Sequence, residues 1–326
     1  MATKLQSLFD QLILGKIVSQ PERVYGGLLH KMLRVETEQG MYAVKQLNPT
    51  IMKRTHVVEH LVYSELVARA AVQNGIPGIT AIGESELVHQ IGDAYFMIFP
   101  WSQAQTISAE RVGVEHCVKV GKILADLHQL SSRFPLSVQE PQRDMEKIEW
   151  DSFLTDDEEC RNLFESYLPQ LKIWDEKAYL VSQKVQADQV ISHRDLDCKN
   201  ILWDADQNPI VIDWESVGWV NPMSELMEIA LYWSGAEILE FDQVKFISFV
   251  ESYLEAGGVL QGDLDAILDF GYRNKLEWLV YNIKRCNGME VAEEMEIELA
   301  KHQVTETIEG LQTYERLIPL LGRLLS

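Results

Sequence analysis

One short stretch of the sequence contains residues whose types and spacing can do chemistry. His193, Arg194 and Asp195 are followed by Asn200, and Asp213 comes after a further short segment. One carboxylate can meet an attacking hydroxyl, while an amide oxygen and a second carboxylate can hold Mg²⁺ against nucleotide phosphates. These residue types in this order therefore indicate phosphoryl transfer.

The elements around this stretch explain how its side chains can meet. The short apolar runs NIL and IVID lie on either side of the turn DADQNP. This pattern predicts a tight strand pair between helices. Because the ends of such a pair lie together, we expect Asp195, Asn200 and Asp213 to meet at one place.

A lysine lies upstream, in the sequence Tyr-Ala-Val-Lys that ends at Lys45. The runs MLRVE and MYAVKQL flank TEQG and predict a hairpin that carries this lysine on its second strand. A lysine so placed can reach the α- and β-phosphates, and a glutamate of the next helix orients it. The predicted helix covers 56–73. Glu65 is the preferred partner because it lies in the middle of this helix, and Glu59 is the alternative.

The remaining patterns predict two domains of the α+β class. RVYGG supplies a strand and a turn before the hairpin, and ELVHQIGD with AYFMIFP forms another hairpin, which gives about five strands and one helix. After Trp101, apolar residues recur every three or four positions, as in long helices. We therefore place a small antiparallel sheet domain in 1–101 and a mainly helical domain in 102–326.

Several ordered motifs resemble the aminoglycoside phosphotransferase and choline kinase family, from the first hairpin to at least Trp233. They are GGLLHKMLRV before YAVKQL, then NGIP, LADLH, SHRDLDCKNILW and IDWESVGWVNPMSEL. The resemblance implies a bilobal, protein-kinase-like fold and a small-molecule kinase that uses Mg²⁺. The phosphoryl donor would be ATP, with GTP as the alternative.

The resemblance also implies roles for single residues. Asp195 would be the catalytic base or the residue that orients the hydroxyl, Asn200 and Asp213 the Mg²⁺ ligands, and Lys45 the clamp on the donor phosphates. His193 would support the loop.

Two further segments would contact the nucleotide. The Phe99 carbonyl and the Trp101 amide would read the purine, because Pro100 between them has no N–H. Gly26 and Gly27 would form the turn over the phosphates, although no G-x-G-x-x-G occurs there.

Other departures from the protein kinase pattern affect the acceptor. Trp214-Glu215 replaces Phe-Gly after Asp213, and no A-P-E segment follows. Protein substrates are therefore disfavoured.

In LADLH we expect His128 to be a packed, hydrogen-bonded side chain. Glu225 either braces the site or is solvated. Lys199 either touches the transferred group or pairs with Asp197.

The charge of the chain is unevenly distributed. The chain carries a formal charge of −21, yet residues 1–101 hold nine basic and nine acidic side chains, so the whole excess follows Trp101. This balance disfavours nucleic acid and favours a cationic acceptor. The acidic run around the last helix is either a solvated face or a rim that attracts such an acceptor; its members are Glu290, Glu293, Glu294, Glu296 and Glu298.

Composition limits the location and the class of the protein. No apolar run is long enough to span a bilayer, and the N-terminus lacks a signal-peptide pattern, so we expect a cytoplasmic protein without a membrane partner. The four cysteines are far apart and are expected to be free thiols.

The acceptor could be an aminoglycoside-like amine, a choline-like metabolite or a sugar. The alternative to an enzyme is a nucleotide-binding scaffold, which has no need for the full set of Lys45, Asp195, Asn200 and Asp213.

Overall fold

The computed structural model describes residues 2–24, 30–84, 86–133, 145–154, 158–289 and 294–325. These residues form two compact units. The first contains the described residues up to Ser108, together with 129–133 and Ile191–Gly218; the second contains the rest. The stretch 193–213, which holds the predicted catalytic residues, thus belongs to the same unit as the sheet. The division of the sequence at Trp101 remains a prediction.

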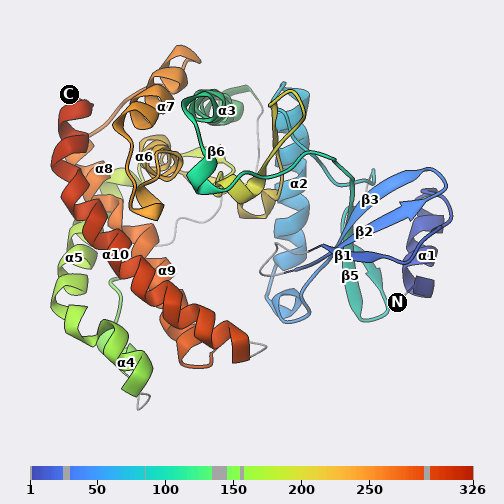
Figure 1. Cartoon of the computed structure of the whole chain (residues 1–326), viewed down its shortest axis with the longest axis horizontal. Coiled ribbons are helices and arrows are strands. Elements are labelled where there is room, and N and C mark those ends of the chain that lie inside the picture. Colours follow the sequence, from blue (N-terminus) through green and yellow to red (C-terminus); the bar gives the residue numbers. More distant parts are fainter. Residues whose placement is uncertain are drawn as a thin grey trace. The chain divides into compact units, whose positions relative to one another are not determined.

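The sheet of the first unit is antiparallel and has five strands, as predicted (Figure 1). The strand order is β1-β2-β3-β5-β4. Its strands are β1 (Glu22–Val24), β2 (Lys31–Thr37), β3 (Gly40–Gln46), β4 (His89–Ile91) and β5 (Ala94–Pro100). The hairpin of β2 and β3 turns between Thr37 and Gly40, so alternate residues of β3 face opposite sides of the sheet. Lys45 lies near the end of β3, opposite Met97 of β5.

One helix covers each face of this sheet. Helix α2 (Val57–Gln73) was predicted, and its Leu61 packs with Leu47 and Met97. Helix α1 (Ala2–Gln11) was not predicted. Its Leu5 and Phe9 are buried against the opposite face of the sheet. The spacing of Leu5, Leu8, Phe9 and Leu12 is the three-and-four repeat of an amphipathic helix and could have revealed it.

The second unit is built mainly of helices, which confirms the prediction of a helical region. After α3 (Val114–Arg133), which begins in this unit, come α4 (Glu158–Phe164), α5 (Leu168–Val185), α6 (Pro222–Trp233), α7 (Gln243–Glu255), α8 (Leu264–Phe270), α9 (Tyr272–Cys286) and α10 (Glu294–Leu324). Helices α9 and α10 lie side by side (Figure 1).

Four short strands lie within or beside the stretch 193–213 in the sequence. They are β6 (Val190–Ser192), β7 (Ile201–Trp203), β8 (Pro209–Val211) and β9 (Gly218–Val220). Strands β7 and β8 form an antiparallel hairpin whose turn is DADQN, 204–208, and Pro209 of the predicted turn is the first residue of β8. The predicted strand pair is therefore confirmed.

A buried polar cluster joins three helices of the second unit. His128 of α3 lies 2.8 Å from the Tyr253 hydroxyl of α7 and 2.7 Å from the Glu225 carboxylate of α6. All three side chains are buried. His128 is thus packed and hydrogen-bonded, as expected, and Glu225 is buried rather than solvated.

We expect His128→Ala to destabilise the protein by about 3 kcal/mol or more, because it takes the imidazole partner from a buried carboxylate. The measurement is the free energy of unfolding in urea. The matched control is His302→Ala, which removes a similar pair with Glu306 whose two side chains are 71% and 58% exposed. An exposed pair of this kind contributes less than about 1 kcal/mol. Equal effects of the two substitutions would contradict the prediction.

The expectation of four free cysteines is wrong for two of them. Cys160 of α4 and Cys286 of α9 form a disulfide, with their Cα atoms 6.0 Å apart. Their 126-residue separation hides the contact, which arises because α4 and α9 lie together in the fold. Cys117 and Cys198 are buried and take no part in a disulfide. Among the described residues, no helix is both long and apolar enough to cross a membrane.

Candidate active site

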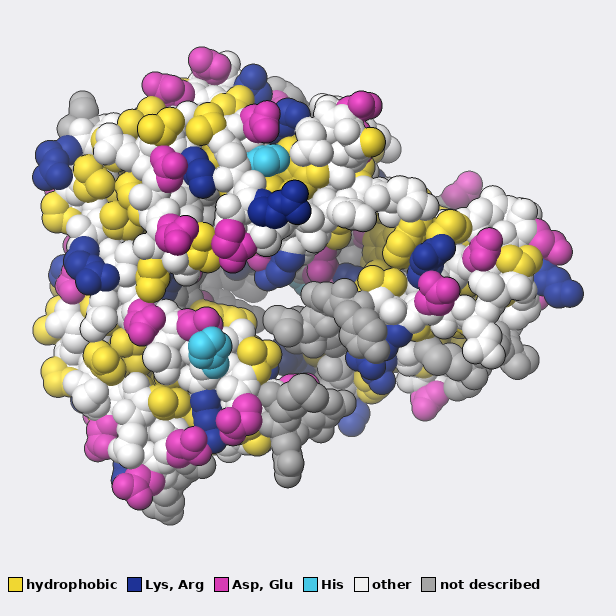
Figure 2. All heavy atoms as spheres, in the orientation of Figure 1, with side chains coloured by type: hydrophobic (Ala, Val, Ile, Leu, Met, Phe, Trp, Pro, Cys, Tyr) yellow, Lys and Arg dark blue, Asp and Glu magenta, His cyan; other side chains and the backbone are white. Residues whose placement is uncertain are grey.

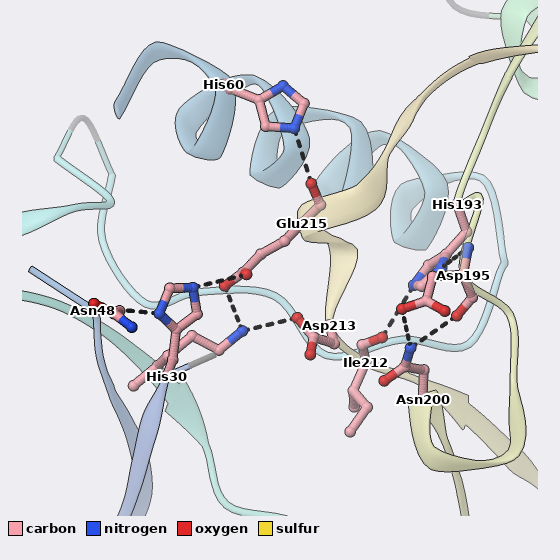
Figure 3. A network of polar contacts seen from close by, with 10 residues as sticks. His30, Asn48, His60, His193, Asp195, Asn200, Ile212, Asp213 and Glu215 are labelled. Atoms are coloured by element: carbon pink, nitrogen blue, oxygen red, sulfur yellow. Dashed lines mark hydrogen bonds and ion pairs between the residues drawn. The ribbon is translucent and has the colours of Figure 1, made fainter. Parts of the chain in front are cut away.

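The β7–β8 hairpin brings the two predicted metal ligands to the same end. Ile201 pairs with Val211, and the Ile212 amide donates to the backbone carbonyl of Asn200 at 3.0 Å. Asn200 and Asp213 therefore both lie at the open end of the hairpin, although thirteen positions separate them in the sequence. Figure 3 shows both side chains with their partners.

The loop before the hairpin is held by a histidine. His193 is fully buried, and its Nε2 lies 3.0 Å from the Ile212 carbonyl oxygen. Because a carbonyl only accepts, Nε2 carries the proton, and Nδ1 is free to accept from the Asp195 amide at 3.3 Å. Nε2 thus ties the loop to the segment that leads into Asp213, and Nδ1 holds the backbone within the loop.

Asn200 holds the predicted catalytic carboxylate. Its Nδ2 donates to the Asp195 side chain and to the Asp195 carbonyl, both at 2.8 Å (Figure 3). Because the amide nitrogen is committed to Asp195, the Asn200 Oδ1 is the atom left for another ligand. Lys199 pairs with Asp197 at 2.6 Å and lies 3.9 Å from Asp195. Asp197 in turn accepts from the backbone amides of Lys199 and Asn200 and so caps the turn.

Two residues of this stretch have left-handed backbone conformations that disfavour side chains. The φ angles are 65° at Arg194 and 61° at Asp213. Such conformations cost about 1 kcal/mol or more each and persist where the surrounding structure requires them. The Asp213 side chain remains 42% exposed, so it stays accessible.

Lys45 is drawn into this site by two carboxylates. Its Nζ lies 2.8 Å from Asp213 Oδ1 and 2.6 Å from Glu215 Oε1. Burial alone would lower the pKa of Lys45, but attraction to Asp213 and Glu215 outweighs it and raises the pKa. The predicted lysine and the predicted metal-binding aspartate therefore meet, across 168 positions of sequence.

The predicted partner of Lys45 is wrong. Glu65 lines the same small pocket as Lys45, but its carboxylate accepts from the Ala81 amide. Glu59 is exposed and lies beside His56. Lys45 is instead paired with Glu215, which the sequence analysis named only as a departure from a motif. No spacing rule could identify it, because its position depends on the tight turn Trp214–Ser216.

The buried Glu65 carboxylate should make stability depend on pH. Burial raises the pKa of Glu65 from 4.5 to about 7, only partly opposed by the Ala81 amide, Arg69 and Lys45. The folded protein therefore holds a proton that the unfolded chain releases, and this contribution to stability falls as pH rises from about 4.5 to 7.

We expect Glu65→Gln to remove this dependence and to stabilise the protein at pH 8 by up to about 3 kcal/mol. Urea unfolding between pH 4 and 8 measures it. Glu59→Gln, on the exposed side of the same helix, should leave the wild-type profile unchanged. A Glu65→Gln protein whose stability still falls across this pH range would contradict the assignment.

The predicted reading of the purine must also be corrected. The Trp101 amide donates to the Met41 carbonyl at 3.1 Å, so it belongs to the ladder between β3 and β5. Ala43 and Phe99 are paired two positions along, and strand alternation gives the Phe99 carbonyl the same direction, toward β3. The Ile98 carbonyl points the other way, where it accepts from the Ile82 amide. Gly26 and Gly27 lie outside the described residues.

Acidic side chains do not gather in one place on the visible face of the helical unit. Figure 2 shows them interspersed with lysines and arginines. Of the predicted acidic run, Glu290 and Glu293 lie outside the described residues. Glu298 is exposed and pairs with Lys301 at 2.8 Å. At Glu298 the solvated-face interpretation therefore holds.

Comparisons with known proteins agree with this geometry. A profile described as the phosphotransferase enzyme family matches residues 22–267. No curated protein sequence matches the chain significantly.

Solved structures match along nearly the whole chain. A spectinomycin phosphotransferase in complex with ADP and spectinomycin has a TM-score of 0.71 at 16% identity and covers 97% of this chain and 99% of its own. An amicoumacin kinase in complex with AMP-PNP and Ca²⁺ has a TM-score of 0.66 at 11% identity, over 95% and 96%. The choline kinase of Streptococcus pneumoniae has a TM-score of 0.60 at 14% identity, over 96% and 99%. The predicted kinase-like fold is therefore confirmed.

Proposed function

Because this chain belongs to the phosphotransferase enzyme family, we propose that it transfers the γ-phosphoryl group of ATP to a hydroxyl of a small, cationic molecule. The family itself confirms the coarser expectation, a small-molecule kinase of the aminoglycoside phosphotransferase and choline kinase type. One observation carries the proposed phosphoryl transfer. Lys45 Nζ lies 2.8 Å from Asp213 Oδ1, and Asp213 lies with Asn200 at the open end of the β7–β8 hairpin.

Each of these residues has a distinct task in the proposed reaction. Asp195, held by Asn200, accepts a hydrogen bond from the acceptor hydroxyl and directs its oxygen toward the γ-phosphorus. Lys45 binds the donor phosphates through its buried ammonium. His193 keeps the Asp195 backbone in register with the segment before Asp213. Proximity and fixed charges then supply most of the rate enhancement.

The donor set at the hairpin end fits Mg²⁺. The Asn200 amide oxygen and one carboxylate oxygen of Asp213 are hard ligands, and Mg²⁺ in nucleotide sites commonly uses one or two protein groups together with phosphate oxygens. When bound, the ion would neutralise charge that develops between the phosphates.

The strand geometry suggests which backbone groups read the base. Along β5, the Ile98 carbonyl points away from β3, so the Pro100 carbonyl and the Ser102 amide face the same edge by alternation. We assign base recognition to these two groups in place of Phe99 and Trp101. A carbonyl next to an amide can pair with N6–H and N1 of adenine or with N1–H and O6 of guanine, so we propose ATP as the donor and keep GTP as the alternative.

The negative charge after Trp101 supports a cationic acceptor, because it favours the approach of cations over anions. An aminoglycoside-like amine and a choline-like metabolite both satisfy this condition. A sugar is the neutral alternative. The scaffold alternative is disfavoured because Lys45, Asp195, Asn200 and Asp213 are all present. The cytoplasmic location stays a prediction.

The proposed function is tested by nucleotide consumption. Purified protein with Mg²⁺ and ATP or GTP is offered aminoglycosides, choline-like amines and neutral sugars. We expect acceptor-dependent ADP formation, with a phosphorylated hydroxyl in the product by mass spectrometry. Tight nucleotide binding without turnover on any acceptor would favour the scaffold instead.

For an amine acceptor, we expect kcat/KM to fall as salt rises, because charges that attract the acceptor are screened within about 8 Å at physiological ionic strength. A neutral acceptor should show little change. Replacing the glutamates of 290–298 by glutamine tests whether that run contributes. A salt-independent kcat/KM for the amine acceptor would show that the acidic region serves solubility alone.

A further inference from the structure

We propose that Glu215 is the positioning residue for Lys45, and that His30 holds Glu215 in place for this task. The inference rests on the proposed function, in which Lys45 binds the donor phosphates. It deepens that function by assigning the lysine partner to the segment after Asp213 instead of to helix α2.

The Glu215 carboxylate uses both of its oxygens in this arrangement (Figure 3). Oε1 lies 2.6 Å from Lys45 Nζ, and Oε2 lies 3.0 Å from His30 Nε2. The backbone N–H of Asn48 donates to His30 Nδ1 at 3.0 Å, so Nδ1 is an acceptor and the ring proton is on Nε2. The tautomer of His30 is thereby set to donate to Glu215.

The backbone of Glu215 is anchored separately. His60 of α2 has its Nε2 2.9 Å from the Glu215 carbonyl oxygen, and because a carbonyl only accepts, His60 donates. Helix α2 thus still supports the lysine, but it does so through a histidine and the backbone of Glu215. The carboxylate and the carbonyl of one residue are both bound, which leaves Glu215 little freedom to turn away from Lys45.

A second carboxylate beside Lys45 has a clear use. Asp213 is also the proposed metal ligand, so a lysine held by Asp213 alone would compete with the metal for that carboxylate. Glu215 is bound to Lys45 and His30, and its side chain is 23% exposed against 42% for Asp213. It can therefore keep Lys45 in place whichever way the Asp213 side chain turns.

The test is a double-mutant cycle on nucleotide binding. The affinity for ADP is measured by calorimetry with EDTA and again with Mg²⁺, for wild type, Glu215→Gln, Lys45→Met and the double variant. We expect Glu215→Gln to weaken metal-free binding by about tenfold, the usual effect of losing a hydrogen bond between charged groups. In the Lys45→Met background the same substitution should change binding less than about twofold, because its target is gone.

Two further variants keep the test decisive. His30→Ala should weaken metal-free binding in the same direction by about threefold, and this effect too should vanish without Lys45. Glu59→Gln, exposed on α2 and remote from Lys45 in its contacts, is the matched control and should bind as wild type. If Glu215→Gln does not fold, the His30→Ala cycle carries the test.

Four outcomes would overturn the proposal. An equal loss with and without Lys45 would show that Glu215 does not act through the lysine. A loss confined to the measurements with Mg²⁺ would make Glu215 a metal ligand. If Lys45→Met itself left ADP binding unchanged, the donor role of Lys45 in the proposed function would fail as well; a strong effect of Lys45→Met with none from Glu215→Gln would reject only the positioning.

Discussion

Asp195→Asn is expected to lower the rate of phosphoryl transfer by about a hundredfold or more and to leave nucleotide binding unchanged. The substitution removes the charge that meets the acceptor hydroxyl but keeps the shape of the side chain. Its amide oxygen can still accept from Asn200 Nδ2, which now holds Asp195 at 2.8 Å. The folded loop should therefore survive, and the loss should appear in kcat.

The measurement is steady-state turnover with the acceptor identified by the nucleotide-consumption screen, together with ADP affinity and the urea midpoint. The control is Asp206→Asn, in the turn of the β7–β8 hairpin, because Asp206 is exposed and distant from Asp195 along the chain. It should leave turnover at the wild-type value. Near-wild-type turnover of the Asp195→Asn protein would reject the role of Asp195.

Local sequence patterns predicted much of the fold. The hairpin of β2 and β3, helix α2 and the β7–β8 hairpin each have a short-range signal, a turn residue or a regular apolar spacing, that acts within about twenty residues. The meeting of Lys45 with Asp213 was predictable because a known arrangement of motifs places them together. Helix α1, which was not predicted, carries the same kind of local signal in its apolar spacing.

The partner of Lys45 could not be predicted in the same way. Glu65 satisfies every spacing rule, yet its carboxylate binds the Ala81 amide, while Arg69 of the same helix donates to the Ala81 and Gly83 carbonyls. The choice between Glu65 and Glu215 depends on how a loop and a three-residue turn are placed in space. Neither has a sequence pattern that sets its direction.

The error at the hinge has a different origin. The pairing of β3 with β5 sets the direction of each backbone group, and a shift by one residue reverses it. Reasoning from the missing N–H of Pro100 selected Phe99 and Trp101, but these are the residues whose groups face Met41 and Ala43 in β3. A strand register proposed from the sequence would give the correct direction of each backbone group at the hinge.

The two proposed metal ligands differ in charge, and this difference should separate their variants. Asp213 offers a full negative charge to a hard cation, whereas Asn200 offers only an amide dipole. We expect Asp213→Ala to abolish the increase in nucleotide affinity that Mg²⁺ produces. Asn200→Ala should reduce this increase but keep part of it. Calorimetric titration of ADP with Mg²⁺ and with EDTA measures both.

Each substitution also has a second effect that identifies it. Asp213→Ala removes one of the two carboxylates at Lys45, so the lysine keeps Glu215 as its partner and metal-free binding should persist. Asn200→Ala releases the Asp195 carboxylate, so kcat should fall even at saturating Mg²⁺. Asp213→Asn, which removes the charge but not the shape, should resemble Asp213→Ala in its metal dependence. If the Asp213→Ala protein responded to Mg²⁺ as the wild type does, Asp213 would not be a metal ligand, and the charge at the end of the β7–β8 hairpin would have to serve Lys45 alone.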